Sequence, residues 1–314
     1  MASSPSYEIS RVPHTFVGAD ALDGLGDIVD GLGGGELVII ADQGVDATGY
    51  IARVVDALRP RAVTIHVVAW GEPTLDSVDA AAAVVRAAND PVVIGIGGGS
   101  ALDIAKQAAV VSTGDGGIEP YLLCATALPG RRPIVAIPTT SGTGAEATRT
   151  CIVADRSGRK LWTWGDEMLP DVVVLDPTAA ATMPHPVTVG TGLDAFVHAI
   201  EACSGQRRNS IASAAAQRAL ALVLAHLPRV ALDGSDLGSR QAMQEAAFLA
   251  GVAIDNWSGT SPASPTPTRK PPLPWAVMST TSPMSSPRSA TSRDSTPRWD
   301  LVMWLCLSTT SPPR

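Results

Sequence analysis

Residues 91–100 read Pro-Val-Val-Ile-Gly-Ile-Gly-Gly-Gly-Ser, an apolar run that ends in three successive glycines. The run predicts a strand at 91–96, and the Ala- and Ile-rich residues 100–111 behind it predict a helix. Without Cβ atoms, the amides of such a turn and the start of the helix can approach an anion closely. The pattern is a variant of the dinucleotide fingerprint, so we expect Gly97, Gly98, Gly99 and Ser100 to bind phosphate. A plain glycine-rich turn is the alternative.

On both sides of this stretch, short β-branched runs alternate with Ala-rich stretches of helical period. Continuous apolar strands separated by helices are typical of a largely parallel sheet that is covered on both faces. We therefore predict an α/β domain with a doubly wound sheet. Its further predicted strands are 36–42, 62–68, 133–137 and 172–175, and its further predicted helices are 49–58 and 75–88.

After Pro184 no further strand is indicated, and amphipathic stretches at about 188–203, 209–227 and 238–255 predict an all-helical second part. The prolines at 184 and 186 place the boundary near residue 185. We expect an α/β domain at 1–185, an incomplete helical domain at 186–259 and a separate tail at 260–314.

Composition divides the chain at the start of that tail. Residues 1–259 carry 17 Lys and Arg against 28 Asp and Glu, whereas residues 260–314 carry 6 against 2. The acidic body argues against nucleic acid as a partner, because phosphate backbones need clustered positive charge. The four cysteines form no C-x-x-C pair, and no stretch reads as a leader or a membrane span, so we expect a cytoplasmic protein that does not bind membranes.

A second hydroxyl- and glycine-rich turn, at 138–146, follows the predicted strand 133–137. Its Thr139, Thr140 and Thr143 suit a nucleotide that lies across the carboxyl ends of parallel strands. Asp42 ends the strand 36–42, where a carboxylate can accept hydrogen bonds from ribose hydroxyls and repel a 2′-phosphate. This favours NAD over NADP, with a helix N-cap as the equal alternative for Asp42.

A third motif lies in the helical part, where Asp194 and His198 are four residues apart. That spacing puts both side chains on one face of a helix, within reach of one divalent ion. A capping or surface pair is the alternative.

Together, these motifs resemble the iron-containing (group III) alcohol dehydrogenases over about residues 10–259. The segments that carry the resemblance, in the family's order and approximate spacing, are Gly97-Gly98-Gly99-Ser100-x-x-Asp103-x-Ala105-Lys106, Pro138-Thr139-Thr140-x-Gly142-Thr143-Gly144-x-Glu146, Leu169-Pro170, Asp176-Pro177 and Gly192-Leu193-Asp194-Ala195-x-x-His198-Ala199-x-Glu201.

The resemblance implies a dehydroquinate synthase-like architecture, with NAD or NADP in a cleft and one Fe²⁺ or Zn²⁺ ion. It implies that Asp194 and His198 ligate the metal and that a lysine placed like Lys160 lies near the cofactor; we count Asp103 with the cofactor residues. The implied activity is hydride transfer between the nicotinamide and a small alcohol, aldehyde or ketone. A homodimer is expected by analogy.

The match fails where the family places two further histidine ligands, because none of the five histidines follows His226. The metal site is thus incomplete, and activity is expected to be impaired. Residues 260–314, of which 31 are Ser, Thr or Pro, are interpreted as the product of a shifted reading frame with little fixed structure. For residues 260–314, the alternative is a genuine disordered tail. For the function of the chain, the alternatives are a catalytically inactive NAD-binding remnant and a reductase of keto acids such as maleylacetate.

Overall fold

The computed structural model describes residues 9–33, 35–204 and 209–257, all within the first of two compact units, Met1–Thr266. The expectations for 260–314, little fixed structure and a shifted frame, lie outside the described residues.

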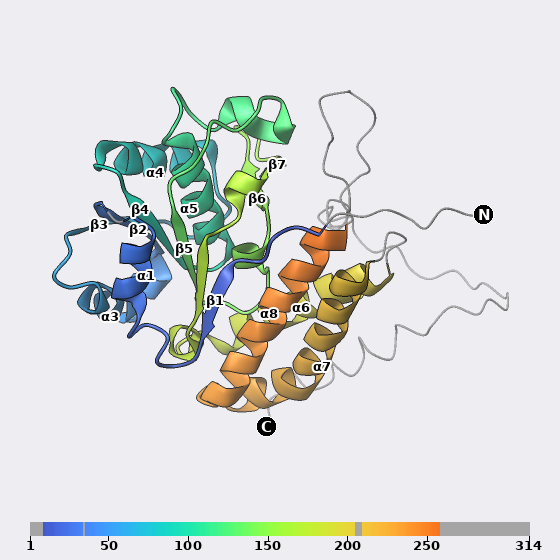
Figure 1. Cartoon of the computed structure of the whole chain (residues 1–314). Coiled ribbons are helices and arrows are strands. Elements are labelled where there is room, and N and C mark those ends of the chain that lie inside the picture. Colours follow the sequence, from blue (N-terminus) through green and yellow to red (C-terminus); the bar gives the residue numbers. More distant parts are fainter. Residues whose placement is uncertain (1–8, 34, 205–208, 258–314) are drawn as a thin grey trace, which may run out of the picture. The chain divides into compact units, whose positions relative to one another are not determined.

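A six-stranded parallel sheet forms the centre of this unit (Figure 1). Its order is β1-β8-β5-β4-β2-β3, and every neighbouring pair is parallel. The strands are β1 (His14–Val17), β2 (Leu37–Asp42), β3 (Val63–Val68), β4 (Val92–Gly97), β5 (Ile134–Pro138) and β8 (Val172–Leu175). In the sheet, β2 lies between β3 on one side and β4 on the other. The direction in which successive strands are added therefore reverses between β2 and β4.

Helices cover both faces of the sheet, as alternate residues of β2 show. Leu37 and Ile39 pack with α1 (Leu25–Gly31) and α3 (Tyr50–Ala57), whereas Val38 and Ile40 pack with α4 (Leu75–Ala87) and α5 (Gly99–Val111). The short α2 (Gln43–Asp46) follows β2 directly. The predicted doubly wound fold is confirmed.

Several elements are absent from the sequence prediction. The edge strand β1 is only four residues long, and helix α1 follows it closely. An antiparallel hairpin of β6 (Thr150–Ala154) and β7 (Lys160–Trp164) lies outside the main sheet. The short 3₁₀ helices η1 (Glu119–Cys124), η2 (Ala145–Ala147), η3 (Asp166–Met168) and η4 (Pro177–Ala180) complete the connections.

Helices α6 (His185–Ser204), α7 (Ser210–Leu232) and α8 (Leu237–Trp257) form the layer beside β5 and β8 (Figure 1). Two helices extend beyond their predicted limits. Helix α6 begins at His185, before the predicted start at about 188, because Pro186 lies in its first turn, where a missing N–H costs nothing. Helix α7 continues through Pro228 to Leu232, because Val223 and Val230, on either side of the proline, are both buried in the core of the helical layer.

Among the described helices, α7 is long and apolar enough to cross a membrane by length and composition. Core helices pass the same test, and α7 buries residues such as Ala216 and Leu222 within the protein. This is weak evidence for a membrane span.

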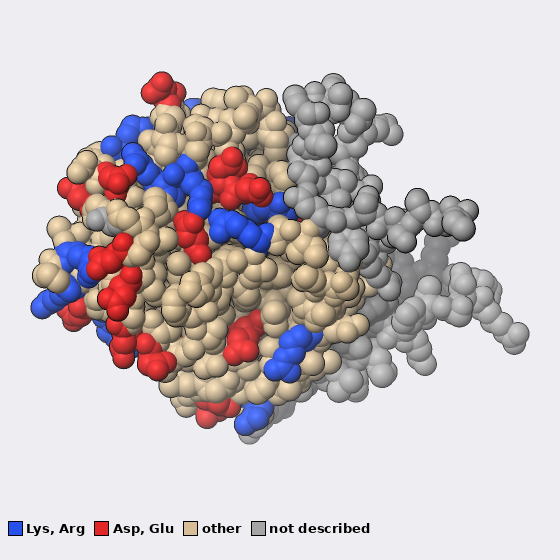
Figure 2. Space-filling model, in the orientation of Figure 1, with Lys and Arg blue, Asp and Glu red and all other residues tan. Residues whose placement is uncertain are grey.

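On the face drawn in Figure 2, acidic and basic side chains of the described residues are interspersed over the α/β layer. That face carries no continuous basic surface, in agreement with the acidic balance of residues 1–259.

Candidate functional site

The two glycine-rich turns predicted from the sequence lie next to each other at the carboxyl edge of the sheet. Gly97 at the end of β4 is in register with Pro138 at the end of β5, and the amide of Thr139 donates to the carbonyl of Gly97 at 2.9 Å. The turns therefore form one continuous backbone surface at the strand ends.

Close packing explains why glycines occupy this surface. Gly97 has φ +152°, and a Cβ there would lie 2.7 Å from the Cβ of Ala101 and 2.8 Å from that of Asp42. A Cβ on Gly99 would lie 2.8 Å from Thr143 Oγ1. No larger residue fits these two positions without displacing its neighbours.

Gly98 differs from them and is the N-cap of α5, with extended backbone at φ −77° and ψ −175°. A Cβ there would come no closer than 3.2 Å to the Thr140 methyl group. The first amides of α5 have no intrahelical acceptor, so Gly99 and Ser100 present N–H groups at the positive end of the helix. This arrangement can bind a phosphate or another anion.

Asp42 stands beside this turn, at the reversal of strand order between β2 and β4. It caps the short helix α2, because its Oδ1 accepts from the amide of Gly44 at 2.6 Å. The N-cap interpretation of Asp42 therefore holds. In doubly wound sheets a ligand binds outside the strand ends at such a reversal, so the carboxylate also lies where a ribose would come.

The turn after β5 also contacts the helical layer. A Cβ on Gly142 would lie 2.7 Å from the carbonyl oxygen of Thr191 in α6, and Gly144, with φ +63°, packs against Gly251 in α8. From α8, the amide of Gln244 donates to the carbonyl oxygens of Pro138 and Asp176 at 3.1 and 3.0 Å. Residues 138–144 are thus held between the sheet and the helices.

Lys106 fixes the far end of this turn from within the core. Its side chain is fully buried, and its ammonium donates to the carbonyl oxygens of Ala145, Thr148 and Thr150 at 2.7, 3.0 and 3.2 Å. All three N–H groups of the ammonium are therefore used. Asp103, 3.5 Å away, supplies the opposite charge.

The side chain of Asp103, on α5, points into the protein core rather than toward the strand ends. Its Oδ2 accepts from the amide of Ile152 at 2.8 Å, which ties the hairpin to α5. Burial raises the pKa of Asp103, against the opposing effect of Lys106. Burial alone would lower the pKa of Lys106, but Cys151 and Asp103 raise it. These contacts support the turn from behind.

Glu146, within η2, is a second buried acid next to the turn. Its side chain is almost fully buried, and its Oε1 has no hydrogen-bond partner among the described residues. Burial raises the pKa of Glu146 to about 7. Ser141 likewise buries its Oγ without a partner in this part of the structure. The turn thus holds unsatisfied polar atoms.

Lys160 begins the second strand of the hairpin and lies at the surface. Its Nζ pairs with Glu72 Oε1 at 2.7 Å, and about half of each side chain is exposed. The lysine is anchored by this pair and contacts neither of the two turns through the bonds that it forms.

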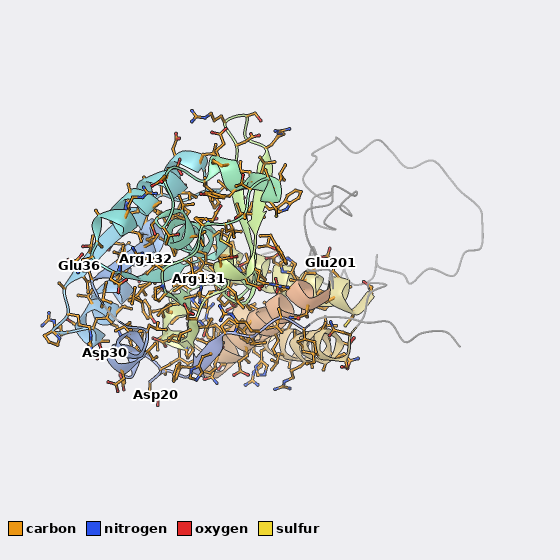
Figure 3. The ribbon with its side chains drawn as sticks, turned by 45° about the horizontal axis from the view of Figure 1, so that its top comes forward. Asp20, Asp30, Glu36, Arg131, Arg132 and Glu201 are labelled. Atoms are coloured by element: carbon orange, nitrogen blue, oxygen red, sulfur yellow. The ribbon has the colours of Figure 1, made fainter. Side chains whose placement is uncertain are left out.

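Asp194 and His198 lie on one face of α6, as the spacing predicts. The Asp194 Oδ1 and His198 Nε2 atoms are 3.7 Å apart, and Asp194 is the more exposed of the two side chains. Glu201 follows one turn later on the helical layer, on the other side of the unit from Asp30 and Glu36 (Figure 3). Burial raises the pKa of Glu201, His198 lowers it and Asp194 raises it.

These donors do not complete a site for Fe²⁺ or Zn²⁺. Across residues 9–33, 35–204 and 209–257, no group of three or more His, Cys, Asp or Glu side chains is arranged to hold a metal. A tight site for either ion normally takes at least three protein ligands. The described residues therefore provide a carboxylate and an imidazole, and no more.

The structure thus brings Asp42, Gly97, Gly98, Gly99, Ser100, Thr139, Thr140 and Thr143 to one edge of the sheet, and it leaves Asp103 in the core and Lys160 at the surface. Sequence reasoning assigned no role to Lys106 or Glu146, although both lie in the quoted motifs. The available signal was the pair of Asp103 and Lys106, three residues apart on a largely apolar helix. The sequence prediction also missed Trp70, which donates from Nε1 to Asp42 Oδ1 at 2.9 Å.

Two family models match the chain in succession. The model of the iron-containing alcohol dehydrogenases matches residues 13–177, and that of the C-terminal part of the Fe-containing alcohol dehydrogenase family matches residues 188–261. The short interval between the two matches contains the start of α6.

Individual relatives agree with these matches. Long-chain-alcohol dehydrogenase 1 of Geobacillus thermodenitrificans is 35% identical over 249 residues, which are 78% of this chain and 63% of that protein. Sulfoacetaldehyde reductase of Bilophila wadsworthia is 33% identical over 80% of this chain and 65% of its own. The chain therefore spans less than two thirds of the length of these relatives.

Solved structures extend the likeness to the fold. The sulfoacetaldehyde reductase of Bifidobacterium kashiwanohense, in complex with NAD⁺, aligns with a TM-score of 0.76 at 28% identity over 80% of this chain and 67% of that chain. A 1,3-propanediol oxidoreductase aligns with a TM-score of 0.74 at 29% identity over 81% of this chain and 67% of its own.

Proposed function

Because the chain belongs to the iron-containing alcohol dehydrogenase family, we propose that the carboxyl edge of its sheet binds NAD. The observation that carries the proposal is the joined pair of turns at 97–100 and 139–143, with Asp42 beside them at the reversal of strand order. A related enzyme of the same fold has been solved with NAD⁺.

The positions of the polar groups suggest how the dinucleotide lies. The pyrophosphate takes the amides of Gly98, Gly99 and Ser100 at the start of α5. The adenosine ribose bonds to Asp42, whose negative charge disfavours the 2′-phosphate of NADP. The nicotinamide then extends along Thr139, Thr140 and Thr143 toward α6, where Asp194 and His198 lie.

The reaction class we propose is hydride transfer between NAD and a small alcohol, aldehyde or ketone, in which bound NAD carries the hydride. The names of the relatives, a long-chain-alcohol dehydrogenase and a sulfoacetaldehyde reductase among them, support this class. The pair of Asp194 and His198 favours the metal-dependent alcohol branch over reduction of a keto acid such as maleylacetate.

We propose that turnover is impaired, because the described residues offer two donors, Asp194 and His198, where a tight Fe²⁺ or Zn²⁺ site needs three or more. The second candidate function, a nucleotide-binding remnant without activity, rests on the same observation. We also propose a cytoplasmic homodimer, which light scattering and cell fractionation would check.

Calorimetric titration with NADH and a panel of short alcohols with added Fe²⁺ or Zn²⁺ test the proposal together. We expect NADH binding with little metal-dependent oxidation. Rapid metal-dependent turnover would contradict the impairment, and failure to bind NADH would contradict the whole assignment.

Gly98→Val separates binding from folding. The backbone of Gly98 suits any residue, and a new Cβ would meet only the Thr140 side chain, at 3.2 Å or more, so the larger side chain would block the approach of the pyrophosphate. We expect a folded variant that has lost NADH binding. Gly24→Val, at the exposed N-cap of α1, is the matched control and should bind normally.

A further inference from the structure

Trp70 lies at the carboxyl edge of the sheet, two residues beyond the end of β3. Its indole packs on the backbone of Gly44, where a Cβ would lie 2.7 Å from Nε1 and 2.8 Å from Cζ2. The side chain is nevertheless 73% exposed. An aromatic ring is thus fixed at one edge and left open to solvent across most of its surface.

The strand order shows what this ring faces. The strands β4, β2 and β3 are neighbours in the sheet, so their carboxyl ends form a row of Gly97, Asp42 and Trp70. A Cβ on Gly97 would touch the Cβ of Asp42, and the indole N–H of Trp70 bonds to the same carboxylate. The row joins the phosphate turn to the exposed ring.

The two carboxylate oxygens of Asp42 differ in their hydrogen bonds. Its Oδ1 accepts from the amide of Gly44 at 2.6 Å and from Trp70 Nε1 at 2.9 Å. Among the described residues no donor bonds to Oδ2, which keeps its lone pairs for a ribose hydroxyl. Trp70 therefore orients the group that we propose for the adenosine ribose.

We propose that Trp70 is the side chain against which the adenine base of the dinucleotide stacks. The assignment rests on the proposed function, because it uses the ribose position at Asp42. Adenine is bonded to that ribose, and the indole that bonds to the same carboxylate is an exposed aromatic surface beside it. Every base has a π-face, and indole is the largest aromatic surface that a side chain offers.

Half-ligands identify which end of the dinucleotide meets Trp70. Titrations of the full chain with NAD⁺, ADP-ribose and nicotinamide mononucleotide compare the wild type with Trp70→Ala and Trp70→Phe. We expect Trp70→Ala to weaken NAD⁺ and ADP-ribose by about 10- to 100-fold, as loss of one stacked base does, and to leave nicotinamide mononucleotide unchanged.

Trp70→Phe keeps a ring but loses the bond to Asp42, so we expect a loss of about 3- to 10-fold for the two adenosine ligands. Val67→Ala, on the exposed edge of β3, is the matched control and should bind all three ligands normally. Thermal melts of each variant check the fold, which an exposed side chain should hardly affect.

Two outcomes would overturn the assignment in different ways. If Trp70→Ala bound ADP-ribose with the affinity of the wild type, the stacking role of Trp70 would be refuted, but the proposed NAD site would not. If that variant instead dissociated a dimer, Trp70 would belong, with the exposed Ile65 and Val67, to a contact between two copies of the chain. A wild type that binds none of the three ligands would refute the proposed function itself.

Discussion

The carboxyl edge of the sheet and the Asp194–His198 pair on α6 are built in opposite ways. At the edge, turns from neighbouring strands fit together so closely that a Cβ on Gly97 or Gly99 would overlap its neighbours. On α6, two side chains one turn apart face each other at 3.7 Å, with no third donor among the described residues.

The difference lies in how many separate segments each arrangement needs. Pairing of adjacent parallel strands brings the turns that follow them to the same edge of the sheet. Each turn therefore needs only its own local sequence to take its place in the site. A metal site assembled from several helices depends on every helix that contributes a ligand. The described residues therefore hold the first arrangement complete and provide only two donors for the second.

Lys106→Met should break the edge most severely. It removes the three N–H groups that hold Ala145, Thr148 and Thr150 and leaves Asp103 as an uncompensated buried charge. We expect a loss of about 3–5 kcal/mol in the free energy of unfolding, together with weaker NADH binding. Urea unfolding and NADH titration measure the two effects.

Lys160→Met is the matched control for that change. Its exposed pair with Glu72 should contribute no more than about 1 kcal/mol. Equal losses from the two variants would contradict the supporting role of Lys106.

Glu146→Gln should change how the stability of the turn depends on pH. Burial raises the pKa of Glu146 to about 7 from a usual 4.5, so between these values the folded chain binds more protons than the unfolded chain. Stability from this group is full below about pH 4.5 and falls as pH rises through 7, by about 3 kcal/mol.

The glutamine variant stays neutral, so its free energy of unfolding should vary less between pH 5 and 8, as measured by urea titration at each pH. Glu119→Gln, at an exposed position, is the control. An unchanged slope in Glu146→Gln would argue that another group titrates in this window.

Gly251→Ala should loosen the contact between α8 and the turn that follows β5. A Cβ there would lie 2.5 Å from the carbonyl oxygen of Gly144, so α8 must move away from the turn. We expect a net loss of about 2 kcal/mol by thermal melting, even though alanine favours helix. Gly190→Ala in α6, where a new methyl group meets nothing within 4 Å, should instead stabilise the protein slightly.

Zinc should have the smallest effect. Because α6 offers two donors, added Zn²⁺ at a concentration below its dissociation constant should stabilise the chain by less than about 0.5 kcal/mol. His198→Ala should melt with the same small zinc dependence as the wild type. A zinc-induced rise in melting temperature that His198→Ala abolished would show a stronger site than the described donors form.

The sequence predicts most of this fold because continuous β-branched runs such as Leu37–Asp42 can be read without knowledge of their neighbours. It misses β1, whose four residues are only partly buried and take their place by pairing with β8. It ends α7 too early at Pro228, since packing on both sides of the proline outweighs local preference.

The candidate site divides in the same way. Glycines and threonines directly after predicted strands signal the edge, because the carboxyl ends of parallel strands meet at one edge of the sheet. The role of Lys106 depends on carbonyl groups about 40 residues away, and that of Trp70 on an aspartate 28 residues away. Such contacts exist only once the strands have paired, so no local pattern predicts them.

The packing of Gly142 on Thr191 and of Gly144 on Gly251 has a consequence for hydrogen exchange. Contacts with the turn oppose the local opening of α6 and α8 that exposes their helical amides to solvent. A ligand seated on the turn would slow exactly those opening events. Nucleotide binding should therefore increase deuterium protection along α6 and α8.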